Sequence, residues 1–167
     1  RSSDLYLGQP ISTSSSAISC PLHASVSGVV RSIEMISDAG RAGQVEAVVI
    51  ENDRLDELYP AIARSRAERK SPDELSAAEV VAIAREAGIV GLGGAVFPTY
   101  KKIEGSVGKV RTIFVNGAEC EPFITSDHRT MLEHPEELID SIRLLMRVVG
   151  SEKAVIAVED NKQDAAD

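Results

Sequence analysis

The stretch Gly91-Leu-Gly93-Gly94-Ala95-Val96-Phe97-Pro98-Thr99 is the first part of the sequence whose residue types and spacing suggest chemistry. Closely spaced glycines let backbone N–H groups approach a phosphate or a flat ring without a side-chain clash. Phe97 could stack on such a ring, and Lys102 could neutralise a phosphate. The dinucleotide-binding fingerprint is excluded, because the glycines follow a predicted helix and Val96 stands where that fingerprint has Gly or Ala. The stretch is therefore a ligand-binding loop or a connection that allows tight packing.

A second polar stretch, Asn116-Gly117-Ala118-Glu119-Cys120-Glu121-Pro122, begins where a strand predicted over 112–115 ends. The acidic cluster Glu159-Asp160-Asn161 follows another predicted strand, over 154–158. Open α/β sheets bind ligands outside the carboxyl ends of their strands. If the two strands are parallel neighbours, both polar clusters reach one edge of the sheet, which predicts a site there. The alternative is that these are ordinary acidic loops of an acidic protein.

The two cysteines, Cys20 and Cys120, are 100 residues apart, which excludes a disulfide framework and a Cys-x-x-Cys metal clamp. Two glutamates flank Cys120, and neighbouring anions disfavour a thiolate, so we expect a bystander thiol rather than a nucleophile. Cys20 and His23 have the spacing of metal ligands, but no second pair lies close in the sequence. We therefore expect His23 not to bind a metal.

These stretches need elements that position them. Ser71-Pro72-Asp73-Glu74 has the form of a capping box, and Ser76-Ala-Ala-Glu79 offers a second helix start that Gly88 would end. Apolar residues at helical spacing predict a helix over 135–149. The order strand, helix, strand over 112–158 predicts two parallel strands. Residues 161–167 are predicted to begin a further helix.

The first part of the chain has a different pattern. β-branched residues bounded by Gly, Ser and Asp predict strands over 26–30, 33–36 and 45–50. The predicted class is therefore α+β overall: a small all-β module over 1–58, a connector over 59–70 and an α/β module over 71–167. The connector is locally basic and is interpreted as a solvated linker or helix face, with a phosphate or partner contact as the alternative.

Composition excludes several classes of function. The chain has 167 residues, a net charge of −8 and 43% hydrophobic residues, which is typical of a globular protein. The acidic balance argues against binding nucleic acid or an anionic membrane surface. No apolar run reaches the roughly 18 residues of a membrane-spanning helix. Because the chain begins with Arg1 and closes on a helix-like stretch, we expect it to be part of a longer protein.

Together the motifs resemble the C subunit of the Rnf-type ion-translocating electron-transport complex, in the expected order and over nearly the whole chain. The residues that carry the resemblance are Gly8–Ile11, Pro21–Gly28, Gly88–Thr99, Asn116–Pro122, Asp127–Arg129 and Val158–Lys162. The first two stretches resemble a barrel-sandwich, lipoyl-like module, and the others a partial Rossmann-like flavin- and NADH-binding module. The flavin-dependent cobalamin reductase of propanediol metabolism shares these motifs, and the NADH-binding flavoprotein subunit of respiratory complex I is a more distant relative.

The resemblance implies that the chain binds FMN and NADH and accepts a hydride from NADH. It implies that Phe97 stacks on the nicotinamide or its adenine, that Lys102 contacts the FMN phosphate and that Asn116 bonds the flavin. It also places Glu121 beside NADH. The full set of implied cofactor-binding residues is Gly91, Gly93, Gly94, Ala95, Phe97, Lys102, Asn116, Glu119, Glu121, Glu159 and Asn161.

The resemblance also implies partners and a location. These are the other subunits of a membrane electron-transport complex, with the chain peripheral on the cytoplasmic face of the inner membrane. The iron–sulfur cysteine motifs of the family are absent, so 4Fe-4S clusters are expected only in the full-length protein. Val96 stands where the family usually has Gly, and Ala118 where the complex I relative has an acidic residue. Val96 predicts weakened or lost flavin affinity, because a β-branched residue does not easily adopt positive φ.

Three hypotheses follow from the sequence. The chain is the flavin and NADH entry module of an electron-transport complex, a docking module of the same fold without cofactor, or a cobalamin-reductase-like flavoenzyme. A lipoyl or biotin carrier is rejected, because residues 1–58 contain no lysine that could be modified.

Overall fold

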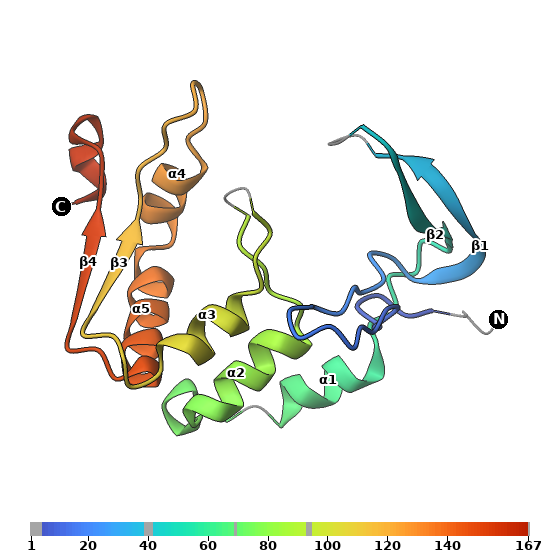
Figure 1. The fold of residues 1–167 in the computed structure, drawn as a ribbon, viewed down its shortest axis with the longest axis horizontal. Coiled ribbons are helices and arrows are strands. Elements are labelled where there is room, and N and C mark those ends of the chain that lie inside the picture. The colour runs from blue at the N-terminus through green and yellow to red at the C-terminus, as the bar shows by residue number, and fades with distance from the viewer. Residues whose placement is uncertain (1–4, 39–41, 69, 93–94, 167) are drawn as a thin grey trace. The chain divides into compact units, whose positions relative to one another are not determined.

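The computed structural model describes residues 5–38, 42–68, 70–92 and 95–166. The chain divides into two compact units, residues 1–70 and 71–167. In the described residues, helices accompany two separate two-stranded sheets, one in each unit (Figure 1). This mixture agrees with the predicted α+β class.

The first unit contains an antiparallel hairpin. Its strands are β1 (Gly28–Ser37) and β2 (Gln44–Asn52), and Ile33 pairs with Val48. The two strands predicted over 26–30 and 33–36 belong to one strand, β1. Its pairing register with β2 shifts between Val30 and Ser32, but the strand does not end there. An irregularity of this kind bends a strand without ending it, which explains why the sequence pattern looked broken there.

A polar contact closes the base of the hairpin. Ser27 is fully buried; its hydroxyl donates to Asp53 Oδ1 at 2.6 Å and accepts from the Glu57 amide at 3.2 Å. Two hydrogen bonds satisfy the buried hydroxyl, so its burial is not costly. The helix α1 (Pro60–Ala67) follows, with Pro60 in its first turn. The predicted connector is therefore largely helical.

The second unit begins with two capping boxes in series. The first, from Ser71 to Glu74, starts only the 3₁₀ turn η1 (Pro72–Glu74). The second starts α2 (Ala77–Glu86), where the Ser76 hydroxyl accepts from the Glu79 amide at 3.3 Å and the Ser76 amide donates to Glu79 Oε2 at 2.8 Å. An N-cap residue has extended backbone angles, so the Ser76 cap ends the first turn before it can lengthen.

The core of this unit lies where α2, α3 (Thr99–Ser106) and α5 (Pro135–Val149) pack together. The buried apolar residues on these helices are Val80, Ala84, Tyr100, Ile103, Ile142, Val148 and Val149. The bounds of α5 confirm the predicted helix, which ends at Gly150 in the left-handed region with a φ of 76°. Glycine adopts that conformation without the steric cost of a Cβ, which explains the stop.

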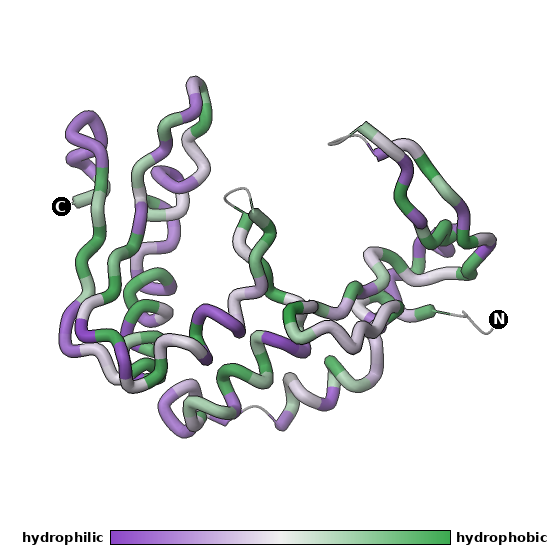
Figure 2. The backbone as a smooth tube through the Cα atoms, viewed as in Figure 1, coloured by the Kyte–Doolittle hydropathy of each residue, from purple (hydrophilic) through white to green (hydrophobic). Residues whose placement is uncertain are grey.

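The strands β3 (Thr112–Asn116) and β4 (Lys153–Ala157) pair in parallel, in a register that sets Thr112 against Lys153 and Asn116 against Ala157. This confirms the predicted parallel pair. The connection between them contains α4 (Ser126–Glu133) and α5. After β4 the chain forms the 3₁₀ segment η2 (Asp160–Ala165), which is hydrophilic, whereas β4 is largely hydrophobic (Figure 2).

Candidate functional site

The parallel pairing brings two polar segments to one edge of the sheet. Asn116 is the last residue of β3, and its register partner Ala157 is the last residue of β4. The segments 116–121 and 159–161 therefore leave the sheet at the same end, as the sequence predicted. The Gly117 amide donates to the Ala157 carbonyl at 2.8 Å, which joins the 116–121 segment directly to the end of β4.

The turn after β3 depends on a residue without a side chain. Gly117 is buried, and a Cβ atom there would lie 2.9 Å from Met131 Sδ and 3.1 Å from the Ala157 carbonyl oxygen. The side-chain oxygen of Asn116 accepts from the Ala118 amide at 3.2 Å, which bends the chain in an Asx turn. Asn116 is itself exposed, and the Asx turn uses only its side-chain oxygen, which leaves the side-chain amide group as a donor.

Glu119 binds the N-terminal end of α4. Its Oε1 accepts from the Asp127 amide at 2.9 Å and from the Ser126 hydroxyl at 3.1 Å, and its Oε2 accepts from the His128 amide at 3.1 Å. These bonds, the one from the Asp127 amide first, hold the pKa of Glu119 below its usual value, and the charge of Lys162 lowers the pKa further. A carboxylate is stabilised at this end of a helix. Glu119 is thus an ionised anchor between the 116–121 segment and α4.

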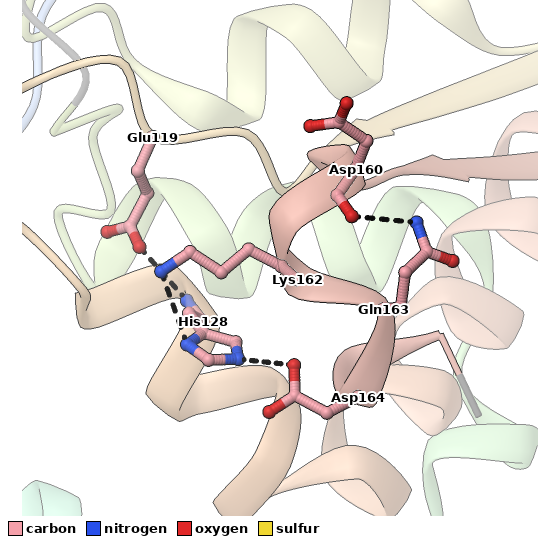
Figure 3. Close-up of polar contacts among 6 residues, drawn as sticks. All are labelled: Glu119, His128, Asp160, Lys162, Gln163 and Asp164. Atoms are coloured by element: carbon pink, nitrogen blue, oxygen red, sulfur yellow. Dashed lines mark hydrogen bonds and ion pairs between the residues drawn. The ribbon is translucent and has the colours of Figure 1, made fainter.

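The imidazole of His128 connects α4 to η2 (Figure 3). Its Nε2 lies 2.9 Å from Asp164 Oδ1, and its Nδ1 lies 3.4 Å from Lys162 Nζ. The hydrogen bond with His128 is the main cause that lowers the pKa of Asp164. None of these three residues is among the site residues predicted from the sequence. The parallel strands indicate only that segments beyond their ends share one edge, and no sequence spacing indicates these three contacts.

The glycine-rich loop connects α2 to α3. Two backbone hydrogen bonds close its base: the Gly91 amide donates to the Phe97 carbonyl, and the Thr99 amide donates to the Ile89 carbonyl, both at 2.9 Å. Gly93 and Gly94 lie outside the described residues, and Ala95 is exposed. The described parts of the loop, on either side of these two residues, project from the helices that flank it (Figure 1).

Three of the predicted residues meet at the base of this loop. Lys102, in α3, carries its ammonium 6.0 Å from the centroid of the Phe97 ring. The position that a Cβ of Gly91 would occupy is 3.7 Å from the same ammonium nitrogen. Lys102 is exposed and the Phe97 ring is partly exposed, so a solvent-borne anion and a flat ring can reach both.

Val96 is in the left-handed region, with a φ of 50°. The backbone at this position therefore has the conformation that glycine adopts most readily, and a β-branched side chain occupies it. The side chain is 58% exposed, so packing does not compensate for the backbone strain.

The remaining predicted residues make fewer contacts. Glu121 is exposed, and its carbonyl oxygen accepts from the Ile124 amide at 3.3 Å. Glu159 is partly buried, and its carbonyl accepts from the Lys162 amide at 3.0 Å, whereas Asn161 is exposed. The candidate residues thus form two groups: the loop base with Gly91, Phe97 and Lys102, and the sheet edge.

Neither a metal-binding cluster nor a membrane-spanning helix is found in the described residues. No group of three or more His, Cys, Asp or Glu side chains in this part of the chain is arranged to hold a metal ion. Within the same residues, no helix has both the length and the apolar character that crossing a membrane requires.

Comparison with known proteins covers both units. Residues 84–167 match the Nuo51 FMN-binding domain, and residues 3–55 match the RnfC barrel sandwich hybrid domain. The chain is 41% identical over 159 residues to the C subunit of a proton-translocating ferredoxin:NAD(+) oxidoreductase complex from Clostridium ljungdahlii, covering 95% of this chain and 34% of that protein. It is 41% identical over 162 residues to the C subunit of the Na(+)-translocating ferredoxin:NAD(+) oxidoreductase complex of Acetobacterium woodii, covering 96% of this chain and 35% of that protein.

This chain therefore spans about a third of the length of these curated relatives. The matched FMN-binding domain contains both groups of candidate residues, and the two matched domains follow one another in the order that the sequence resemblance gave. The chain belongs to the family of C subunits of Rnf-type ion-translocating electron-transport complexes.

Proposed function

We propose that the chain binds FMN and NADH and accepts a hydride from NADH in an electron-transport complex. The observation that carries the proposal is that residues 84–167, which match an FMN-binding domain, contain both the loop base and the sheet edge. A glycine-rich loop with an exposed cation suits a phosphate, and a polar sheet edge suits a nucleotide. The finer fold is proposed accordingly: a barrel-sandwich module over 1–58 and part of a Rossmann-like module over 71–167.

The residues present fit FMN. Gly91 leaves the space beside the Lys102 ammonium free of a side chain, and that ammonium is exposed for a phosphate. We assign Lys102 to the FMN phosphate and the loop residues Gly91, Gly93, Gly94 and Ala95 to the flavin ring. Bound FMN would supply the hydride acceptor, so the protein needs to supply binding and orientation rather than a general acid or base.

The sheet edge is assigned to the remaining contacts. Asn116 is exposed and its side-chain amide can donate to the flavin, and Phe97 offers a ring that can stack on the nicotinamide or its adenine. Glu121 is assigned to NADH, with Glu119 and Glu159–Asn161 shaping the same edge. Carboxylates near a flavin disfavour its anionic reduced form, so this acidic edge would tune the flavin potential.

Electrons would then pass from the flavin to 4Fe-4S clusters, which we place in the rest of the full-length protein. The partners would be the other subunits of the complex, with this chain peripheral on the cytoplasmic face of the membrane. The names of the two relatives include ferredoxin and NAD(+), which makes a ferredoxin-linked complex the proposed setting.

A docking module without cofactor is the second candidate, and Val96 favours it. A branched side chain in a left-handed backbone conformation strains the loop that would hold the flavin. In that case the fold would serve only to join other subunits.

Titration with FMN separates the two candidates. We expect flavin fluorescence to change with saturation at one FMN per chain, and we expect the absorbance of the bound flavin to bleach when NADH is added. Val96→Gly should bind FMN more tightly than the wild-type protein. If both proteins leave FMN free in solution, the docking module is the better account. If FMN binds but NADH does not reduce it, the assignment of NADH is wrong.

A further inference from the structure

His128 contacts the polar segment 116–121 and the 3₁₀ segment η2, which follows β4. Its backbone amide donates to Glu119, and its imidazole reaches Asp164 and Lys162 in η2. Its side chain is only 17% exposed, so the ring is held mainly by protein (Figure 3). One residue thus joins the segment after β3 to the segment after β4.

The hydrogen-bond partners of the ring indicate which of its nitrogens carries the proton. The Lys162 ammonium can only donate, so Nδ1 accepts from it. Nε2 then carries the single ring proton and donates to the Asp164 carboxylate at 2.9 Å. A lysine or arginine here could not accept from Lys162, and an ionised carboxylate could not donate to Asp164. Glutamine offers both functions, because its amide has an oxygen acceptor and an N–H donor.

The contact between His128 and Lys162 also restrains the turn just before Lys162. The Lys162 amide donates to the Glu159 carbonyl at 3.0 Å, which closes the turn that contains Glu159–Asn161. η2 also contains local bonds: the Gln163 side chain donates to the Asp160 carbonyl, and the Ala166 amide donates to the Gln163 carbonyl. The charge of Lys162 also acts on Glu119. The ring of His128 therefore supplies long-range contacts that hold this turn against α4.

We propose that His128 is a positioning residue that fixes η2 against α4 and thereby sets Glu159–Asn161 beside Asn116 and Glu119 for the nicotinamide nucleotide. The inference rests on the proposed function, because it takes NADH as the ligand of this edge. His128 acts through the residues that it holds and does not itself touch the ligand.

Three variants test this role. His128→Phe keeps a flat ring but removes both ring hydrogen bonds, whereas His128→Gln keeps an acceptor and a donor. His134→Phe is the matched control, because its side chain is 56% exposed at the end of α4 and makes no contact with η2 among the described residues. Each protein is loaded with FMN and titrated with NADH. The rate of flavin reduction at saturating NADH and the amide hydrogen exchange of residues 160–165 are measured alongside.

We expect His128→Phe to weaken NADH binding about tenfold, because holding η2 in place for the ligand then costs the free energy of the lost hydrogen bond to the charged Asp164. The reduction rate at saturating NADH should stay within about twofold, because a positioning residue affects binding more than the chemical step. Exchange of residues 160–165 should speed up. His128→Gln should restore both NADH binding and protection from exchange, and His134→Phe should match the wild-type protein.

The outcomes distinguish this inference from the proposed function. If His128→Phe exposes residues 160–165 to exchange but binds NADH as tightly as the wild type, the inference is overturned and the proposed function stands. The inference also fails if His128→Gln is as impaired as His128→Phe, or if FMN affinity falls together with NADH affinity. If NADH does not reduce the flavin of the wild-type protein, both fail.

Discussion

The amide nitrogen of Gly117 lies 2.8 Å from the carbonyl oxygen of Ala157, so the strand pairing continues one residue into the polar loop. This bond fixes the point at which the 116–121 segment turns away from the sheet. Met131 of α4 packs against the same point, within 3.2 Å of where a Cβ of Gly117 would stand. Strand, loop and helix are therefore joined at a residue that has no side chain.

Gly117→Ala should destabilise the protein by about 1–3 kcal/mol, because a Cβ forces Met131 and the Ala157 carbonyl to move. Gly105→Ala is the matched control, since a Cβ at that position in α3 meets nothing within 4 Å. The control should instead stabilise the protein by about 0.5–1 kcal/mol, because alanine favours helix. Urea denaturation measures both, and equal effects of the two changes would contradict the packing argument.

Val96→Gly should stabilise the protein by about 0.5–1 kcal/mol, because relief of the clash of a Cβ at the observed φ of 50° outweighs the unfolded-chain entropy that glycine adds. Val107→Gly provides the comparison, since Val107 has a φ of −55° and gains nothing from glycine. That change should cost about 0.5–1 kcal/mol through the entropy of the unfolded chain. Thermal denaturation distinguishes the two. A loss of stability in Val96→Gly would show that the side chain contributes more than the strain costs.

Lys102→Gln should weaken FMN binding about tenfold, because it removes a charge-assisted contact with the phosphate. Riboflavin lacks the phosphate, so its affinity should be the same for the wild type and the variant. Lys101→Gln is the control: that ammonium donates to Glu104 at 2.7 Å in the same helix. Fluorescence titrations with both flavins check the prediction. An equal loss for FMN and riboflavin would rule out the phosphate as the partner.

Glu119→Gln should destabilise the protein at neutral pH and matter less in acid. The pKa of folded Glu119 is lowered from 4.5, so its carboxylate stabilises the fold above that pH and loses this effect as the pH falls through the folded pKa. The difference in unfolding free energy between wild type and variant should therefore shrink from about pH 7 to about pH 3. A difference that is constant with pH would contradict the role of the charge.

The strongest local patterns predicted their elements well. The helix α5 begins at Pro135 and ends before Gly150, as its apolar spacing and end residues indicated. The parallel pairing of β3 and β4 followed from the order of the elements, and with it the shared edge of the two polar segments. These features depend on residues close together in the sequence or on a general rule of connection.

Other elements could not be predicted, because distant residues stabilise them. The helix α3 contains Gly105 and two lysines, but it forms where Tyr100 and Ile103 are buried against α2 and α5. The helix α4 is polar, and Glu119 caps it from outside the helix, across 8 residues to Asp127. No local pattern in the sequence marks such a cap.

The sequence predicted which segments form the candidate site better than it predicted the side-chain contacts between them. The two polar segments do reach one edge, yet the bond between His128 and Asp164 spans 36 residues and no spacing rule indicates it. At Ser71 a local pattern is present but does not predict the length of the element. Its capping box starts only a 3₁₀ turn, because a second cap follows at Ser76.

The base of the glycine-rich loop is closed by backbone atoms, through the Gly91 amide with the Phe97 carbonyl and the Thr99 amide with the Ile89 carbonyl. Any residue type except proline provides the two amides, and any residue type provides the two carbonyls. Substitutions or insertions between them can therefore accumulate during evolution without moving α2 or α3. The loop sequence can therefore change between lineages while the scaffold around it is inherited unchanged.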